Sequence, residues 1–280
     1  MNEQASRLIQ LRELEVRENI LSSSKIISVC SGKGGTGKTF FAANFAQSLA
    51  GLGKKILLVD LDLNFSNLNV LLNQTSDSLL SEFFEQRKSL QEIIFDYSGN
   101  LNLIFGDSGR NDYPRVSREI INYFFISLNK VIDRYDYIIL DSSAGADEVT
   151  LHQLIKSDYN IIVTSPEPTA IMDAYVVVKL LSSENSSSLK FVVVNKCLDK
   201  TDADSAFSNL TLATKHFLGD SPEFLGSISF DADAHKSILN QQLLVRENPD
   251  SKSAKEIKSI ANQFVTINQV ANISRPGQII

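Results

Sequence analysis

The sequence is poor in features that would assign it to a specialised class of protein. Its only two cysteines, Cys30 and Cys197, form no C-x-x-C pair, so neither a disulfide framework nor a structural zinc site is expected. With 13 glycines and 6 prolines in 280 residues, and 43% hydrophobic residues, collagen-like, mucin-like and disordered chains are excluded. No run of about 18 consecutive apolar residues occurs, so no membrane-spanning helix is expected.

Charge and histidine content narrow the function further. The formal net charge is -6, which argues against a protein whose whole surface binds nucleic acid, although a local basic patch stays compatible with it. The three histidines, His152, His216 and His235, have no metal-ligand spacing. The N-terminus is of mixed charge and lacks the apolar core of a signal peptide. We therefore expect a cytoplasmic protein.

Short apolar runs alternate with amphipathic segments along most of the chain. This alternation predicts an α/β fold: one doubly wound, mainly parallel sheet flanked by helices. We expect residues 1–24 to form a polar leader helix, 25–268 a single domain and 269–280 a tail. The predicted strands are 26–30, 55–60, 101–105, 137–141, 160–165, 191–195 and 224–229, and the predicted helices include 39–52, 117–133, 169–181 and 253–268.

The strongest motif lies between the first predicted strand and the helix after it. Residues 32–39 read G-K-G-G-T-G-K-T and fit the phosphate-loop pattern G-x-x-x-x-G-K-[ST]. Glycines let backbone N–H groups turn inward around phosphate oxygens, and the helix adds the positive end of its dipole. Lys38 is expected to neutralise the β- and γ-phosphates and Thr39 to offer its hydroxyl to Mg²⁺. The predicted nucleotide contacts are Gly32, Lys33, Gly34, Gly35, Thr36, Gly37, Lys38, Thr39 and Phe40.

Three carboxylates are predicted at the same edge of the sheet as this loop. Asp60 and Asp62 end an apolar strand, and side chains two residues apart on a strand share a face. Asp141 ends the hydrophobic strand Y-I-I-L-D, which is the Walker B arrangement, and is expected to hold Mg²⁺ through water. The carboxyl ends of such strands border the crevice in which ligands bind.

The second lysine of the loop, Lys33, carries a resemblance to a known family. The run K-G-G-T-G-K-T resembles the deviant Walker A motif of the MinD/ParA class of ATPases. The resemblance implies that ATP holds a homodimer together and that Lys33 reaches the partner subunit's nucleotide. It also implies that Asp62 positions the attacking water, with Lys33 and Lys38 as the other catalytic residues, while Asp60 supports the Mg²⁺ shell.

Two further segments resemble the same class and indicate the nucleotide. Residues 141–145, D-S-S-A-G, are similar to the family's D-T/S-P-A-G, which implies that the N–H of Gly145 faces the γ-phosphate. The strand ending in Asn195 resembles the family's adenine contact. A guanine-reading N-K-x-D motif would need an acid at position 198, where the chain has Leu198, so ATP is preferred over GTP.

The run P-E-P-T-A-I-M-D-A-Y at 166–175 is similar to the MinD-like branch that includes FlhG/FleN, regulators of flagellar number and placement. Within this run, Thr169 can cap the following helix. Residues 3–8, E-Q-A-S-R-L, resemble the FlhG element that activates the partner GTPase FlhF. The resemblance implies an ATPase switch that hydrolyses ATP slowly until a partner protein acts, with flagella as the structure it controls.

The C-terminal tail and two other function classes complete the expectations. After Val265 the chain has one basic residue, Arg275, and no aromatic, so direct membrane binding should be weak or absent and recruitment to a pole or membrane would need a partner. The first alternative is a ParA-type segregation ATPase that binds DNA nonspecifically; no base-specific contact is expected. The second is a metabolic P-loop synthetase, which the doubled lysine disfavours.

Overall fold

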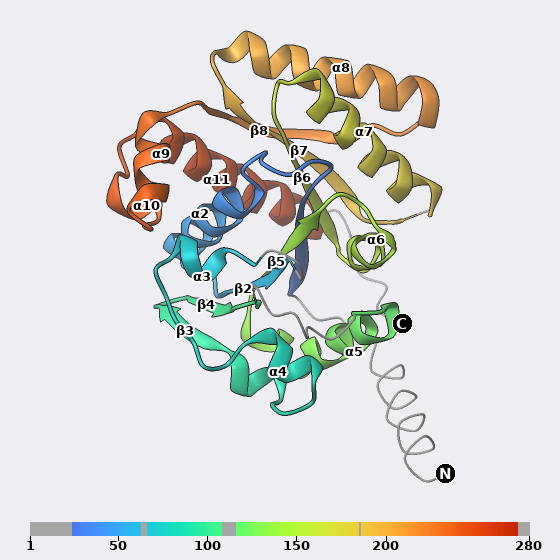
Figure 1. Ribbon diagram of the computed structural model, residues 1–280. Coiled ribbons are helices and arrows are strands. Elements are labelled where there is room, and N and C mark those ends of the chain that lie inside the picture. Colours follow the sequence, from blue (N-terminus) through green and yellow to red (C-terminus); the bar gives the residue numbers. More distant parts are fainter. Residues whose placement is uncertain (1–23, 63–65, 108–115, 185, 274–280) are drawn as a thin grey trace.

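The computed structural model describes residues 24–62, 66–107, 116–184 and 186–273, with side chains up to residue 269. The predicted leader helix, the segment 3–8 and most of the predicted tail therefore lie outside the described residues. The described chain forms one sheet with helices on both faces (Figure 1), which confirms the predicted fold class. No helix within these ranges is long and apolar enough to cross a membrane.

The sheet has eight strands in the order β3-β4-β2-β5-β1-β6-β7-β8. All neighbours are parallel except β3 and β4, which are antiparallel. Strands β5 and β6 pair with the two sides of β1, and the other strands lie further out on each side. The loop after β1 therefore lies near the middle of the carboxyl edge of the sheet. The strands are β1 (Lys25–Ser31), β2 (Ile56–Leu61), β3 (Phe95–Ser98), β4 (Leu101–Ile104), β5 (Tyr137–Ala144), β6 (Tyr159–Thr164), β7 (Leu189–Cys197) and β8 (Glu223–Ser229).

Two helical layers cover the faces of the sheet. Helices α2 and α11 pack on one face, and α4 to α8 cover the other (Figure 1). The helices are α2 (Lys38–Gly51), α3 (Leu68–Leu71), α4 (Leu80–Phe84), α5 (Arg118–Leu128), α6 (Glu148–Ile155), α7 (Pro168–Ser183), α8 (Lys200–Leu218), α9 (Ala232–Leu239), α10 (Leu244–Glu247) and α11 (Lys252–Ile273), with short 3₁₀ turns η2 (Leu90–Ile93) and η3 (Ile132–Arg134).

Central strands are apolar on both faces because both faces are covered. In β1, Ile27 and Val29 face the α2 side, whereas Ile26 and Cys30 join the clusters on the opposite side. In β7, Val193 and Val192 divide in the same way. Continuous rather than alternating apolar runs are typical of such strands.

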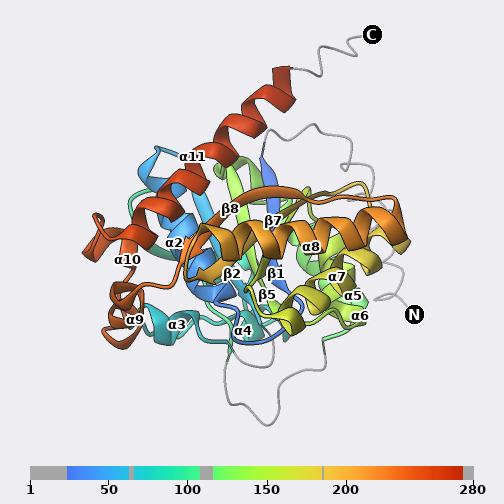
Figure 2. The ribbon, with the colours of Figure 1, turned by 90° about the horizontal axis from the view of Figure 1, so that it is seen from above.

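The last helix, α11, is fixed on the sheet by a buried polar contact at its far end. The amide of Asn268 donates to the Tyr137 hydroxyl at 2.9 Å and accepts from the Tyr159 hydroxyl at 2.5 Å. One turn earlier, Phe264 packs edge-on against both tyrosine rings. The helix then continues past the sheet to Ile273, five residues beyond its predicted end (Figure 2).

The other differences from the predicted elements have local causes. The predicted helix 117–133 ends at Leu128, and a separate 3₁₀ turn follows. Strand β3 was not predicted, because its four residues, FDYS, form a strand only by pairing with β4. The prediction that Thr169 caps α7 is wrong: the N-cap is Glu167 and Pro168 is the first helical residue.

Candidate nucleotide site

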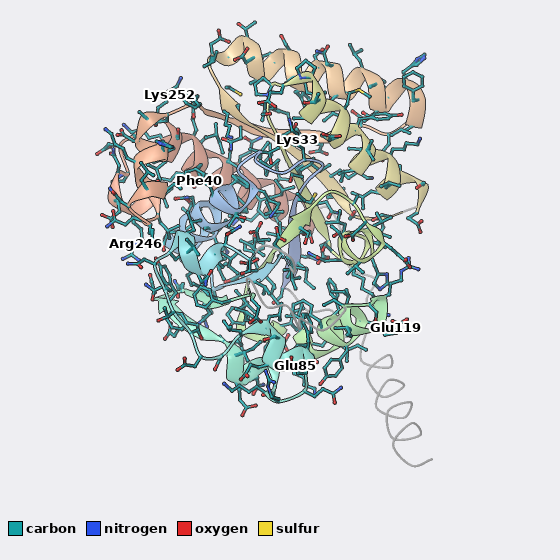
Figure 3. All side chains as sticks on the ribbon, in the orientation of Figure 1. Lys33, Phe40, Glu85, Glu119, Arg246 and Lys252 are labelled. Atoms are coloured by element: carbon teal, nitrogen blue, oxygen red, sulfur yellow. The ribbon has the colours of Figure 1, made fainter. Side chains whose placement is uncertain are left out.

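The phosphate loop connects β1 to α2 at the centre of the carboxyl edge (Figure 3, Lys33). Gly35 and Gly37 have φ angles of 83° and 89°, which residues with a Cβ rarely adopt. A Cβ on Gly37 would lie 2.3 Å from Nδ2 of Asn195, and one on Gly32 would lie 2.2 Å from the carbonyl oxygen of Asp173. The loop therefore needs these glycines for both its turn and its close packing.

The first turn of helix α2, directly after the loop, provides backbone N–H donors. Helix α2 begins at Lys38, and its N-cap, Gly37, supplies no side-chain cap. The first N–H groups of a helix have no acceptor within it, so those of Lys38, Thr39 and Phe40 are oriented to receive an anion. The Phe40 side chain is buried in the core, so only its backbone can serve the predicted nucleotide contact.

The central contact of the site is a buried ion pair between Lys38 and Asp141. Nζ of Lys38 lies 2.7 Å from Oδ1 of Asp141, and the two side chains are 7% and 1% exposed. Burial alone would lower the pKa of Lys38, but Asp141, with Asp62 and Asp60 further away, raises it. The second oxygen of Asp141, Oδ2, is buried and has no hydrogen-bond partner among the described residues.

Asp60 lies next to Asp141 on the neighbouring strand, paired with it in the β2/β5 register. Burial and the repulsion of Asp141 raise the pKa of Asp60 to about 7, although hydrogen bonds to its carboxylate oppose the shift. Both oxygens accept hydrogen bonds from the residues that follow β2. The three predicted carboxylates are thus assembled at one place, with Asp62 directly after the strand.

Lys33 points away from this buried centre. Its side chain is 42% exposed, and Nζ lies 3.0 Å from Oε2 of Glu167 and donates to Oγ1 of Thr169 at 3.2 Å. Both partners belong to the start of α7. The two lysines of the loop therefore lie in opposite environments, one buried against Asp141 and one at the surface.

The end of β5 and the residue after it contact Asp62 and the end of β1. The hydroxyl of Ser143 donates to Oδ1 of Asp62 at 3.3 Å. The N–H of Gly145 donates to the carbonyl of Ser31 at 2.8 Å, so it would have to leave that acceptor in order to face a γ-phosphate.

Asn195 and Lys196, at the end of β7, brace the phosphate loop. Nδ2 of Asn195 donates to the carbonyl of Thr36 at 2.8 Å, and its Oδ1 accepts from the N–H of Lys196. Lys196 has a φ of 61°, and its Nζ donates to the carbonyl of Gly35 at 2.7 Å. Sequence reasoning assigned no role to Lys196, although its place directly after a strand-end asparagine was a usable signal.

Two exposed apolar residues directly follow β7 and β8. Leu198 is 78% exposed and Phe230 is 67% exposed, and the N–H of Phe230 donates to the carbonyl of Cys197 at 2.7 Å. No nucleotide contact was assigned at Phe230 from the sequence. Its position would offer an apolar surface to a nucleotide base.

Replacing Asn195 with Ala tests this bracing contact. We expect affinity for both ATP and GTP to fall about tenfold, because a loosened loop weakens the triphosphate grip that the two nucleotides share. Any additional loss for ATP measures a contact with adenine. Titration with fluorescent nucleotides gives both affinities, and Asn262→Ala, an exposed amide that donates to a carbonyl within α11, is the matched control. Unchanged GTP affinity would show that the brace has no role in binding.

Both cysteines are buried, and neither is poised to react. Cys30, behind the loop, is fully buried, and this burial raises the pKa of its thiol to about 12. Burial likewise raises the pKa of Cys197 to about 11. Within the described ranges no group of three or more His, Cys, Asp or Glu side chains could hold a metal ion alone. A divalent cation here would therefore need hydroxyl and phosphate oxygens as well.

Several known proteins resemble this chain in sequence. Residues 24–191, more than half of the chain, match a family model described as an AAA domain. The chain is 28% identical over 239 residues to the antiactivator FleN of Pseudomonas aeruginosa, covering 85% of each protein. It is 30% identical over 282 residues to the flagellum site-determining protein YlxH of Helicobacter pylori, covering 99% of this chain and 95% of YlxH.

Solved structures share the fold. The cell division ATPase MinD of Pyrococcus furiosus superposes with a TM-score of 0.76 at 24% identity, covering 87% of this chain and 99% of that one. MinD of Pyrococcus horikoshii, solved with Mg-ADP, gives 0.75 at 23% identity, with coverages of 91% and 100%. The family match, the relatives and the phosphate loop agree with the resemblance noted in the sequence. The chain belongs to the MinD/ParA class of P-loop ATPases, with FleN and the flagellar protein YlxH among its relatives.

Proposed function

We propose that the chain is a Mg-ATP-dependent switch that dimerises with ATP and controls the number or placement of flagella through a partner protein. The observation that carries the proposal is the separation of the two loop lysines. Lys38 is buried inside the subunit, whereas the Lys33 side chain is at the surface, where it makes an exposed contact with Glu167 and Thr169. An exposed ion pair is worth about 0–1 kcal/mol, so Lys33 can leave it at little cost to reach a second subunit's nucleotide.

ATP and magnesium fit the residues present. The buried Oδ2 of Asp141 lacks a partner within the described part of the chain, and the Thr39 hydroxyl lies one residue into α2, so these two groups would hold the cation with the support of Asp60. Magnesium, when bound, neutralises phosphate charge. The phosphates would lie on the N–H groups of residues 32–40, and Lys38 would exchange part of its pairing with Asp141 for phosphate oxygens.

Three other residues would complete the site. Asp62 would orient the water that attacks the γ-phosphate, and its contact with Ser143 links it to the end of β5. Gly145 would turn its N–H from Ser31 to the γ-phosphate, which makes this segment sensitive to the nucleotide. Asn195, with Leu198 and Phe230 nearby, would border the adenine.

The flagellar role rests on the relatives. FleN is named as an antiactivator and YlxH as a flagellum site-determining protein, and the match to YlxH extends over nearly the whole chain. A partner protein, such as an FlhF-like GTPase, would read the difference between the dimer and the monomer. Hydrolysis would be slow without it, because a switch needs lifetime more than turnover. The switch would act in the cytoplasm and reach the pole or membrane through that partner.

The variant Asp62→Ala tests the proposal. Without the group that orients water, we expect hydrolysis to fall at least about 100-fold while ATP binding persists, so that ATP holds a stable dimer. Light scattering after gel filtration measures the mass with ATP and with ADP, and Asp250→Ala, an exposed carboxylate at the start of α11, is the control. Normal hydrolysis by the variant would contradict the role of Asp62, and a mass that ignores ATP would contradict the switch.

Affinity capture with the same ATP-locked form from the native host tests the flagellar role. Flagellar proteins among the captured partners would support it. Recovery of a DNA-bound adaptor instead would contradict it and favour a segregation ATPase.

A further inference from the structure

Asp60 has a different set of contacts from the other buried carboxylate of the site. Oδ1 of Asp60 accepts the N–H of Asp62 at 3.1 Å. Oδ2 accepts the Ser66 hydroxyl at 2.6 Å and the N–H groups of Asn67 and Leu68 at 3.2 and 3.1 Å. Each carboxylate oxygen has about two lone-pair sites, so three donors crowd Oδ2 while Oδ1 accepts one.

These four donors lie on both sides of residues 63–65. One belongs to Asp62, directly after β2, and three belong to the start of α3. The Asp60 carboxylate therefore ties the two ends of this connection to the end of β2. Since Asp62 is the residue proposed to orient water, its backbone position depends on this contact.

Two neighbouring segments hold this contact and helix α3 in place. Gly106, after β4, lies so near that a Cβ there would be 2.9 Å from Oγ of Ser66 and 3.0 Å from the carbonyl oxygen of Asp60. At the other end of α3, Nε2 of Gln241 donates to the carbonyl of Val70 at 2.7 Å, which anchors the helix to the turn after α9. Helix α3 is thus held at both ends, and Asp60 holds the end nearest to the nucleotide site.

The carboxylate of Asp141 has an oxygen that could bind a cation. One of its oxygens pairs with Lys38, and the other is buried and accepts no hydrogen bond from the residues that the structure describes. Oδ2 of Asp60 could accept a cation only by releasing one of its three donors, and each buried donor left unpaired costs free energy. Among the described residues, Asp141 therefore offers an oxygen that accepts no hydrogen bond, whereas both oxygens of Asp60 already accept at least one.

We propose that Asp60 is a positioning residue, whose carboxylate fixes Asp62 and residues 66–68, rather than a direct magnesium ligand. The inference rests on the proposed function for the role of Asp62, but the contact itself joins residues of this chain alone. Asp60 would then support the magnesium shell only indirectly, through the position of Asp62.

Hydrogen exchange of the nucleotide-free protein tests the contact directly. We expect Ser66→Ala and Asp60→Asn to accelerate exchange of the backbone N–H groups of residues 62, 67 and 68 about tenfold, because each variant weakens the bonds that protect them. Asp141→Asn should leave these rates within twofold. Ser66→Ala keeps every carboxylate and so remains informative if Asp60→Asn folds poorly.

The magnesium requirement of ATP binding separates positioning from coordination. The Mg²⁺ concentration for half-maximal ATP binding should rise tenfold or more in Asp141→Asn and less than threefold in Ser66→Ala and Asp60→Asn, while the hydrolysis rate falls in all three. An Asp60→Asn variant that needs as much Mg²⁺ as Asp141→Asn, or unchanged exchange at residues 62, 67 and 68, would overturn the proposal. The exchange measurement uses no nucleotide, so its outcome is independent of whether ATP drives dimerisation.

Discussion

Lys38→Ala is expected to abolish nucleotide binding and also to destabilise the nucleotide-free fold. The affinity for ATP should fall at least about 100-fold, because the variant removes the buried cation of the phosphate loop. The free energy of unfolding should fall by about 3–5 kcal/mol, because Asp141 is left as a buried charge without its partner. Isothermal titration and urea unfolding measure the two effects.

A second substitution separates these two effects. In Lys38→Ala with Asp141→Asn, the unpaired charge is removed, so much of the lost stability should return while nucleotide binding stays absent. Lys55→Ala, an exposed lysine just before β2 at the opposite edge of the sheet, is the control. ATP affinity retained by Lys38→Ala would remove the basis for assigning the loop to the phosphates.

Lys33→Ala is expected to abolish the ATP-dependent dimer while ATP binding to the monomer stays within about threefold. The reason is the place of its side chain at the surface, where the contacts with Glu167 and Thr169 are exposed. Hydrolysis should fall with the dimer. Sedimentation velocity with a slowly hydrolysed ATP analogue gives the mass, and fluorescent nucleotide titration gives the monomer's affinity.

The partner of Lys33 supplies the matched comparison. Glu167→Gln removes the charge that pairs with Lys33 without changing the loop. The protein concentration needed for the dimer should therefore stay the same or fall by up to about threefold, because an exposed ion pair contributes little free energy. A dimer that persists in Lys33→Ala would contradict the proposed contact across the interface.

The fold and the identity of the loop were predictable because they depend on short-range patterns. Residues 32–39 carry a spacing that only a strand–loop–helix context satisfies, and the apolar runs around Val29, Val59 and Leu140 are long enough to indicate buried strands. The meeting of Asp60 with Asp141 followed from parallel strands ending at one edge. Helix α8, with its many polar residues, gave too weak an apolar stripe to be predicted.

The contacts of the site could not be predicted because they join residues far apart in the chain. Nothing in the sequence around Asn195 indicates that both of its polar atoms are used on Thr36 and Lys196. The contact of Lys33 with Glu167 likewise depends on how the start of α7 lies against the loop. The hydrogen bonds that Asp60 accepts from residues 66–68 depend on the path of the chain there, and no periodicity in the sequence predicts that path.

The burial of both native thiols makes the protein convenient for spectroscopy. Since burial holds the pKa of Cys30 and Cys197 near 12 and 11, hardly any thiolate forms at neutral pH, and maleimide dyes should leave both residues unmodified. A single cysteine introduced on an exposed helix position would then accept a fluorophore without prior removal of the natural ones. Energy transfer between two labelled copies could follow subunit association in real time.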